Sequence, residues 1–104
     1  MTDKNLSDLE RKIQFKFNRR RLLKTALTHR SYSRNHNEKL EFLGDSVLNY
    51  TISNLVFFEE ESFDEGQLSR VRSNLVNQKA LIKVARFIAL DEHLYVDTAL
   101  QSHN

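Results

Sequence analysis

Apolar residues recur three or four positions apart along most of the chain, which is the spacing of one face of an α-helix. Near the N-terminus this spacing predicts an amphipathic helix that carries Leu6, Leu9 and Ile13 on its apolar face. A second helix is predicted over residues 19–28, and Asn18 precedes it as a candidate N-cap. The chain is therefore expected to begin with two short helices.

A longer helix is predicted after a polar loop. Residues 29–37 contain Ser and Asn at short intervals, which is typical of a loop. The apolar pattern then continues to Phe58, and either Asn35 or Asn37 is placed to cap the start of this helix. If Asn35 is the cap, Glu38 lies at the third helical position, as in a capping box.

The second half of the chain predicts two further helices. The acidic run at residues 59–61 marks the end of the long helix, because acidic side chains oppose the dipole at a helix C-terminus. Asp64 is a candidate N-cap for the next helix, and a break near Asn77 separates that helix from one ending near Leu90. The pattern fades afterwards, and residues 97–104 are expected to form a frayed tail.

Composition indicates a single small all-α domain. The chain has 104 residues, no Pro and two Gly. The absence of Cys excludes disulfides and thiolate metal sites and fits a reducing compartment. No apolar run approaches the ~18 residues of a membrane span, and the N-terminus lacks an apolar targeting segment. We therefore expect a soluble, cytoplasmic protein without a membrane partner or a small-molecule cofactor.

Charge is unevenly distributed, although the net charge is only +2. Residues 1–37 carry ten Lys and Arg against three acids, whereas residues 38–66 carry one Lys against eight acids. A basic segment followed by an acidic one is typical of a surface that attracts a polyanion beside a pocket that holds cations. From charge alone, pairing of these groups within the chain explains the pattern equally well.

Three carboxylates are set into the predicted long helix. Glu38, Glu41 and Asp45 are spaced i, i+3, i+7 and fall within roughly a 60° arc of the helix. The rest of this helix is apolar almost all round, so we expect the acids to be partly buried. Buried carboxylates require bound cations, basic partners or protonation. Oxygen ligands without sulfur or nitrogen favour a hard ion such as Mg²⁺ or Mn²⁺.

The residues around these acids carry a longer pattern. Residues 37–48 read Asn-Glu-Lys-Leu-Glu-Phe-Leu-Gly-Asp-Ser-Val-Leu. This stretch resembles the defining motif of the ribonuclease III family of double-stranded-RNA endonucleases. Residues 26–31, Ala-Leu-Thr-His-Arg-Ser, resemble the family segment that precedes the motif, and residues 64–70 followed by Arg72 resemble the helix after it. The resemblance covers most of the chain.

The resemblance implies an all-α endonuclease domain that homodimerises and binds Mg²⁺, for which Mn²⁺ can substitute. The implied reaction is metal-dependent endonucleolytic hydrolysis of double-stranded RNA, as in the processing of ribosomal RNA precursors and messenger RNA. By resemblance, Glu41 and Asp45 are metal ligands, and Glu38 and Glu65 are further catalytic acids beside the cleaved bond. Phe42 matches the aromatic residue that inserts into the partner subunit at the dimer interface.

Most of these residues also have a purely structural explanation. Glu38 and Glu65 can compensate the dipole at helix N-termini, and Glu41 can pair with a basic side chain. Phe42 taken alone would be a core residue. Asp45 is harder to explain structurally, because Asp is a poor helix former in a helix interior.

Basic residues of the second predicted helix are candidates for RNA binding. Arg19, Arg20, Arg21 and Lys24 would contact phosphates, which makes affinity strongly dependent on salt. A-form RNA is recognised mainly by shape, so no base-specific contact is expected. The alternative function is a non-catalytic module of the same fold that dimerises or binds structured RNA.

The sequence departs from the family pattern at its C-terminal side. In the family, a further helix supplies an Asp and a Glu three positions apart, and bacterial members usually add a double-stranded-RNA-binding domain. Asp91, Glu92 and Asp97 do not lie in such a helical pattern. We therefore expect residues 1–104 to be the N-terminal part of an endonuclease domain that is incomplete at the C-terminus and that alone cleaves slowly or not at all.

Overall fold

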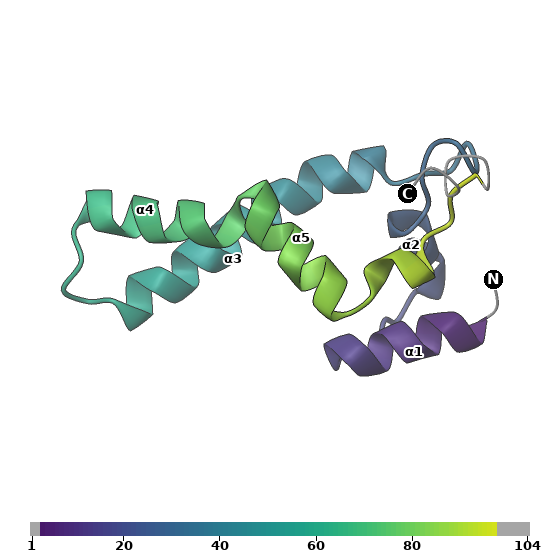
Figure 1. Ribbon diagram of the computed structural model, residues 1–104, viewed down its shortest axis with the longest axis horizontal. Helices are drawn as coiled ribbons and strands as arrows, with labels where there is room; N and C mark the ends of the chain where they lie inside the picture. Colours follow the sequence, from purple (N-terminus) through teal and green to yellow (C-terminus); the bar gives the residue numbers. More distant parts are fainter. Residues whose placement is uncertain (1–2, 98–104) are drawn as a thin grey trace. The chain divides into compact units, whose positions relative to one another are not determined.

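The computed structural model describes residues 3–97, which form five α-helices and one short 3-10 helix (Figure 1). Within this part, the strand-like pairing is limited to one isolated parallel bridge between Thr28 and Tyr95. The all-α prediction is therefore confirmed, whereas the expected frayed tail lies, apart from Asp97, outside the described residues. The elements are α1 (Asp3–Ile13), α2 (Arg20–Ala26), α3 (Glu38–Glu59), α4 (Glu65–Val76), α5 (Gln78–Phe87) and η1 (Leu90–His93).

The chain divides into two compact units. Unit 1 comprises the chain up to Glu41 and from Ala85 onward, and unit 2 comprises Phe42–Val84. The boundaries between the units fall inside α3 and α5. No helix between residues 3 and 97 combines the length and apolar character that crossing a membrane requires.

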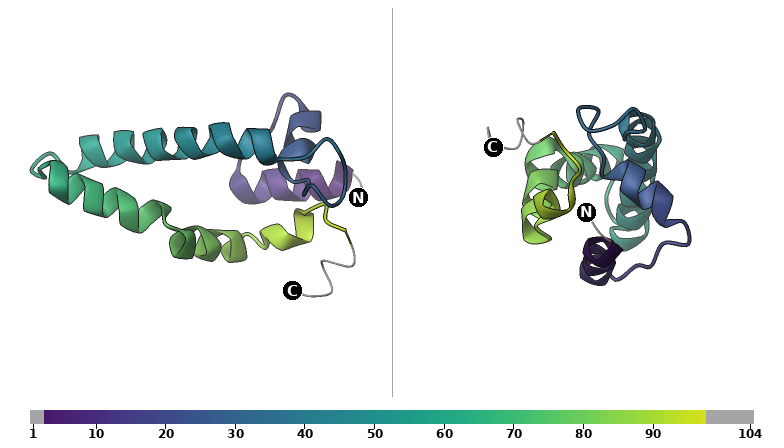
Figure 2. Two further views of the ribbon diagram at one scale, coloured as in Figure 1. Left: turned by 90° about the horizontal axis from the view of Figure 1, so that it is seen from above. Right: turned by 90° about the vertical axis from the view of Figure 1, so that its right-hand side faces the viewer.

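The hydrophobic core of unit 1 joins α1, α2 and the segment after α5. Its buried side chains are Leu6 and Leu9 from α1, Leu23 from α2, and Leu27 and Tyr95, each at most 6% exposed. The spacing of Leu6 and Leu9 places both on one face of α1, as the sequence predicted. Within this unit α1 packs against α2 and η1 (Figure 2).

The segment after α5 returns to this core, which the apolar pattern did not predict. The Tyr95 N–H donates to the Leu27 carbonyl at 2.9 Å, and the His29 N–H donates to the Tyr95 carbonyl at 2.8 Å. The Tyr95 ring lies 5.4 Å from the Tyr32 ring, centroid to centroid. His93, in η1, is only 2% exposed. These residues form no helical repeat, so periodicity carries no signal for their burial.

Lys12 ties this segment to α1. Its ammonium donates to the Ile88 carbonyl at 2.9 Å and lies 3.0 Å from Nε2 of His93. The contact fixes the position of η1 beside the last turn of α1.

Two helices end at a residue with positive φ that is not glycine. Gln14 follows α1 with φ 57°, and Ala89 follows α5 with φ 50°. At the end of α1 the Gln14 N–H donates to the Arg11 carbonyl at 3.3 Å, and the Phe15 N–H donates to the Glu10 carbonyl at 3.1 Å. This pair of bonds is a Schellman motif, which satisfies the last carbonyls of the helix and reverses the chain.

Asp64 is confirmed as an N-cap, Asn18 is wrong, and α3 decides between its two predicted caps in favour of Asn37. Asp64 accepts the Gln67 N–H at 2.8 Å while the Gln67 side chain accepts the Asp64 N–H at 2.9 Å, which forms a complete capping box. The N-cap of α2 is Arg19 instead of Asn18. Helix α3 begins at Glu38, and the carbonyl of Asn37 accepts the Glu41 N–H at 2.7 Å, so Asn37 stands at the N-cap position. The capping box that required Asn35 as the cap does not form.

In unit 2, α3 continues through a short turn into α4, which runs back antiparallel to it (Figure 2). Val56 is the buried apolar side chain of the two helices. A polar contact also joins them, because Nη1 of Arg72 donates to Oγ of Ser53 at 2.8 Å. Asn77 separates α4 from α5, as predicted, and its Oδ1 accepts the Ala80 N–H at 2.8 Å.

Candidate functional site

Glu38, Glu41 and Asp45 lie in the first half of α3, and all three side chains are exposed. The expectation that they are partly buried is therefore wrong. Apolar neighbours on the same helix are exposed too, with Phe42 at 81% and Val47 at 54%. Burial of a helix face depends on which other elements cover it, and the apolar composition of the helix does not decide this alone.

Along α3 itself, the spacing of the acids is compatible with shared ligation. Glu41 and Asp45 are four residues apart in an uninterrupted helix, so they occupy consecutive turns of one face. Residues 5–97 contain no group of three or more His, Cys, Asp or Glu side chains that could hold a metal. Mg²⁺ is usually bound through one or two carboxylates together with waters and substrate phosphates. The two carboxylates therefore fit the protein share of such a site.

The structure supports a purely structural explanation for Glu38 but not for Glu41. Glu38 is the first residue of α3, where it compensates the helix dipole, and its Oε2 lies 3.8 Å from Nη1 of Arg30. Both side chains of this pair are more than half exposed, so it contributes only about 0–1 kcal/mol. For Glu41, no basic group among the described side chains lies within 4.0 Å. The ion-pair explanation of Glu41 therefore has no support in the described part of the chain.

Glu65 lies in the first turn of α4, beside a cavity of about 350 Å³ within unit 2. The first residue of α3 to line this cavity is Ser53, which is eight positions beyond Asp45, or about 12 Å along the helix axis. Glu65 and Asp45 therefore do not line the same cavity, and a shared catalytic site stays a prediction. The cavity is lined by Ser53, Val56, Phe57, Glu65, Leu68, Ser69 and Arg72.

Phe42 is among the most exposed large apolar residues of the described chain. Its side chain is 81% exposed, so its interpretation as a core residue is wrong. Leu43 and Tyr50 of the same helix are also exposed. Exposed apolar side chains of this size are typical of protein interaction surfaces. Insertion of Phe42 into a partner subunit stays a prediction.

Of the four basic residues predicted to bind RNA, one forms hydrogen bonds inside unit 1 and three are exposed. Nη2 of Arg20 donates to Oε1 of Glu10 at 2.7 Å and to Oγ of Ser7 at 2.5 Å. Arg20 therefore anchors α2 to α1 inside unit 1. The other three basic side chains are exposed, namely Arg19, Arg21 and Lys24.

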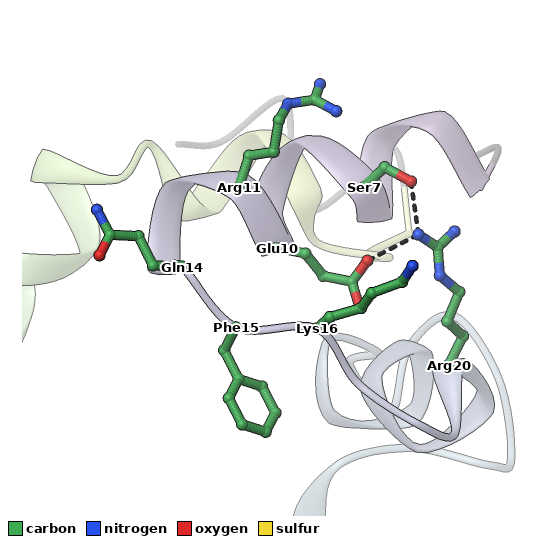
Figure 3. Close-up of a pocket in the computed structure, with 7 residues that line it drawn as sticks. All are labelled: Ser7, Glu10, Arg11, Gln14, Phe15, Lys16 and Arg20. Carbon is green, nitrogen blue, oxygen red and sulfur yellow. Dashed lines mark hydrogen bonds and ion pairs between the residues drawn. The ribbon is translucent and has the colours of Figure 1, made fainter.

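Glu10 is the partner that orients Arg20, and sequence reasoning missed it (Figure 3). Its side chain is buried, and its Oε2 accepts the Phe17 N–H at 2.7 Å. The Phe17 N–H, the Arg20 guanidinium and the charge of Lys16 together hold the pKa of Glu10 below its usual value, and they outweigh burial, which raises it. A single Glu in an amphipathic helix has no motif that would have revealed this role.

Known proteins resemble the chain over most of its length. A model of the family described as Ribonuclease-III-like matches residues 19–104. Ribonuclease 3 of Cupriavidus pinatubonensis is 50% identical over 90 residues, which cover 86% of this chain and 35% of that protein. Ribonuclease 3 of Bordetella pertussis is 46% identical over 94 residues, which cover 90% of this chain and 37% of that protein. The chain thus spans little more than a third of the length of these relatives.

Solved structures agree with the sequence comparison. A crystal structure of the nuclease domain of ribonuclease III from Campylobacter jejuni matches with a TM-score of 0.87 and 36% identity, over 96% of this chain and 69% of that chain. A second structure of that domain, described as flexible in a region involved in dimer formation, matches with a TM-score of 0.85 and 35% identity, over 92% and 68%. The fold of the chain matches these two structures at 35–36% identity, and the family model covers α2 to η1. The chain therefore belongs to the ribonuclease-III-like family.

Proposed function

We propose that this chain provides part of the active site of a divalent-metal-dependent endoribonuclease that hydrolyses phosphodiester bonds of double-stranded RNA. The observation that carries the proposal is the pair of exposed carboxylates, Glu41 and Asp45, on consecutive turns of α3. They lie in the stretch that resembles the defining motif of the family. The ribonuclease 3 relatives, at up to 50% identity, support the same reaction class.

Glu41 and Asp45 would hold the metal, and their oxygen ligands favour Mg²⁺, with Mn²⁺ as a substitute. A bound ion supplies activation of water and neutralisation of charge on the phosphate. Glu38 and Glu65 are proposed as further acids that accept hydrogen bonds from water near the cleaved bond. Their exposed positions leave both carboxylates open to solvent and substrate.

We expect the 104-residue chain alone to cleave slowly or not at all. Mg²⁺ loses its hydration waters reluctantly, so two exposed carboxylates on one helix bind it weakly. Ribosomal RNA precursors and messenger RNA are the substrates that the family resemblance suggests for the active enzyme. Duplex RNA would be bound through phosphate contacts of Arg19, Arg21 and Lys24, which are exposed.

We further propose that Phe42 forms a homodimer contact. Its 81% exposed ring gains about 25 cal/mol for each Å² that a partner removes from water. The same exposed ring also favours the alternative function, a dimerisation or RNA-binding module without catalysis. The two functions differ in whether Asp45 matters, because only the enzyme requires its carboxylate.

Paramagnetic Mn²⁺ tests the metal site without relying on activity. In NMR spectra of the isotopically labelled chain, Mn²⁺ should broaden the amide signals around Glu41 and Asp45 first. The variants Asp45→Asn and Glu41→Gln should lose this selective broadening. Glu60→Gln removes an exposed acid elsewhere on unit 2 and should change nothing. Broadening that persists in both α3 variants would show that the proposed ligands are wrong.

A cleavage assay then separates the two functions. Labelled duplex RNA is incubated with Mg²⁺ and with a ribonuclease 3 that contains this sequence. The Asp45→Asn substitution should abolish cleavage while duplex binding persists. Unchanged cleavage by this variant would refute the proposed role of Asp45, and binding without any cleavage by the unsubstituted protein would favour the non-catalytic module.

A further inference from the structure

We propose that the cavity beside the α1–α2 connection binds one unpaired nucleotide of an RNA, with its base against Phe15 and its phosphate on Lys16. The inference rests on the proposed function, because it takes RNA as the ligand. The cavity lies within unit 1 and has a volume of about 430 Å³, which is in the range of small-molecule pockets. Its lining residues are Ser7, Glu10, Arg11, Gln14, Phe15, Lys16 and Arg20 (Figure 3).

The walls of this cavity follow from the way α1 ends. Ser7, Glu10 and Gln14 recur at i, i+3 and i+7 and so line one face of the helix. The positive φ of Gln14 then reverses the chain, and Phe15 and Lys16 form the next wall. A non-glycine residue rarely adopts this conformation, and here two main-chain bonds hold it. The wall is therefore fixed before any ligand arrives, which lowers the entropic cost of binding.

The buried carboxylate in the cavity does not repel an anion, because its charge is already compensated. Oε2 of Glu10 accepts the Phe17 N–H at 2.7 Å, and Oε1 accepts from the Arg20 guanidinium at 2.7 Å. Arg11 forms an ion pair with Asp8 and points away from the other lining side chains in Figure 3. The remaining lining cation is Lys16, whose side chain lies beside Glu10 and is exposed.

The surrounding sequence makes this surface attractive to a polyanion. Between Glu10 and Glu38 the chain contains nine Lys and Arg and no Asp or Glu. Among the described side chains, no acid lies within 4.0 Å of the Lys16 ammonium. The nearby Glu10 carboxylate is bonded to the Phe17 N–H and to Arg20, so Lys16 forms no ion pair with it and is suited to a phosphate.

Phe15 distinguishes a nucleotide from other anions. Its side chain is 58% exposed, and its contact with Phe17 is edge-to-face, with ring centroids 4.8 Å apart. A nucleobase can stack on such a ring, whereas the carboxylates of an acidic peptide cannot. Bases within a duplex stack on one another, so only an unpaired base can reach Phe15. The preferred ligand is therefore a duplex that carries an unpaired nucleotide, such as a single-stranded overhang.

Fluorescence anisotropy with two labelled RNAs tests the proposal. One RNA is a blunt duplex, and the other is the same duplex with a short unpaired 3′ overhang. The unsubstituted chain should bind the overhang RNA at least about fivefold more tightly, which corresponds to ~1 kcal/mol for one stacked base. The Phe15→Ala variant should lose this preference while its affinity for the blunt duplex stays unchanged, and Phe15→Tyr should retain the preference.

Two further variants complete the design. Lys16→Gln should weaken binding of the overhang RNA and lower the slope of log affinity against log salt by about one. Phe58→Ala is the matched control, because Phe58 is also an exposed phenylalanine, at 67% against 58% for Phe15, and lies in unit 2. It should change neither affinity. Circular dichroism of each variant verifies that the helices are intact. If Phe15→Ala does not fold, Lys16→Gln alone tests the pocket.

Failure of the nucleotide pocket and failure of RNA binding by the chain would give different results. Equal affinity of the unsubstituted chain for both RNAs would overturn the nucleotide pocket and leave duplex binding in place. No binding of either RNA at low salt would overturn this pocket together with RNA binding by this chain. A polyglutamate peptide could instead displace the overhang RNA from the unsubstituted chain but fail to bind the Phe15→Ala variant. That result would show that the proposed ligand class, a nucleotide, is wrong.

Discussion

Replacement of Tyr95 by alanine should cost unit 1 a large part of its stability. Tyr95 is 4% exposed and packs among Leu6, Leu9, Leu23 and Leu27. Truncation of a buried aromatic side chain to alanine typically costs about 3–5 kcal/mol. Small domains are stable by only about 5–15 kcal/mol in total, so this one change removes a large fraction.

The loss has identifiable components in the structure. The ring removes its own area from water, contacts the Tyr32 ring with centroids 5.4 Å apart, and lies 5.1 Å below the Lys24 ammonium. The main-chain bonds of Tyr95 with Leu27 and His29 do not depend on the side chain. The substitution therefore tests side-chain packing and leaves the main-chain pairing possible.

Urea unfolding monitored by circular dichroism measures the effect. We expect the free energy of unfolding to fall by about 3 kcal/mol or more, with a melting temperature roughly 12 °C lower. Tyr95→Phe keeps the ring and should lose much less. Tyr50→Ala removes a tyrosine that is 72% exposed and should stay within about 0.5 kcal/mol of the unsubstituted chain. If Tyr95→Ala behaves like Tyr50→Ala, the segment after η1 is not packed on the core.

Three further predictions follow from local contacts. Asp64→Ala removes the capping box of α4 and should lower the free energy of unfolding in urea by about 1 kcal/mol, with reduced helicity. An unchanged urea midpoint would contradict the role of this cap. Gln14→Gly relieves the positive φ after α1 and should stabilise the chain by about 0.5–1 kcal/mol in the same assay, whereas a loss would show that the Gln14 side chain is needed there. The pKa of Glu10 is lowered in the folded state, so its stabilisation is present above the unfolded pKa and is lost as pH falls through the folded pKa. Glu10→Gln should therefore flatten the decline of stability in acid, as measured by urea midpoints across that pH range, and an unchanged decline would count against the network.

The amino-acid sequence determined those features that depend on residues close together in the chain. The first helix, the break at Asn77 and the capping box at Asp64 all follow from side chains within a few positions of one another. Family membership was also readable from the sequence, because residues 37–48 form one contiguous motif. The spacing of Glu41 and Asp45 is likewise a local property of α3.

The tertiary structure decided which residues are buried and which form hydrogen bonds with distant parts of the chain. The acids of α3 are exposed because no described element covers them, although the helix is apolar. Arg20 belongs to a network with Glu10, ten positions earlier, and Tyr95 pairs with a main chain more than sixty positions away. The end of α1 lacked the glycine that usually marks a positive φ, so Gln14 gave no signal. Such features arise when segments far apart in sequence meet, and local periodicity carries no information about that meeting.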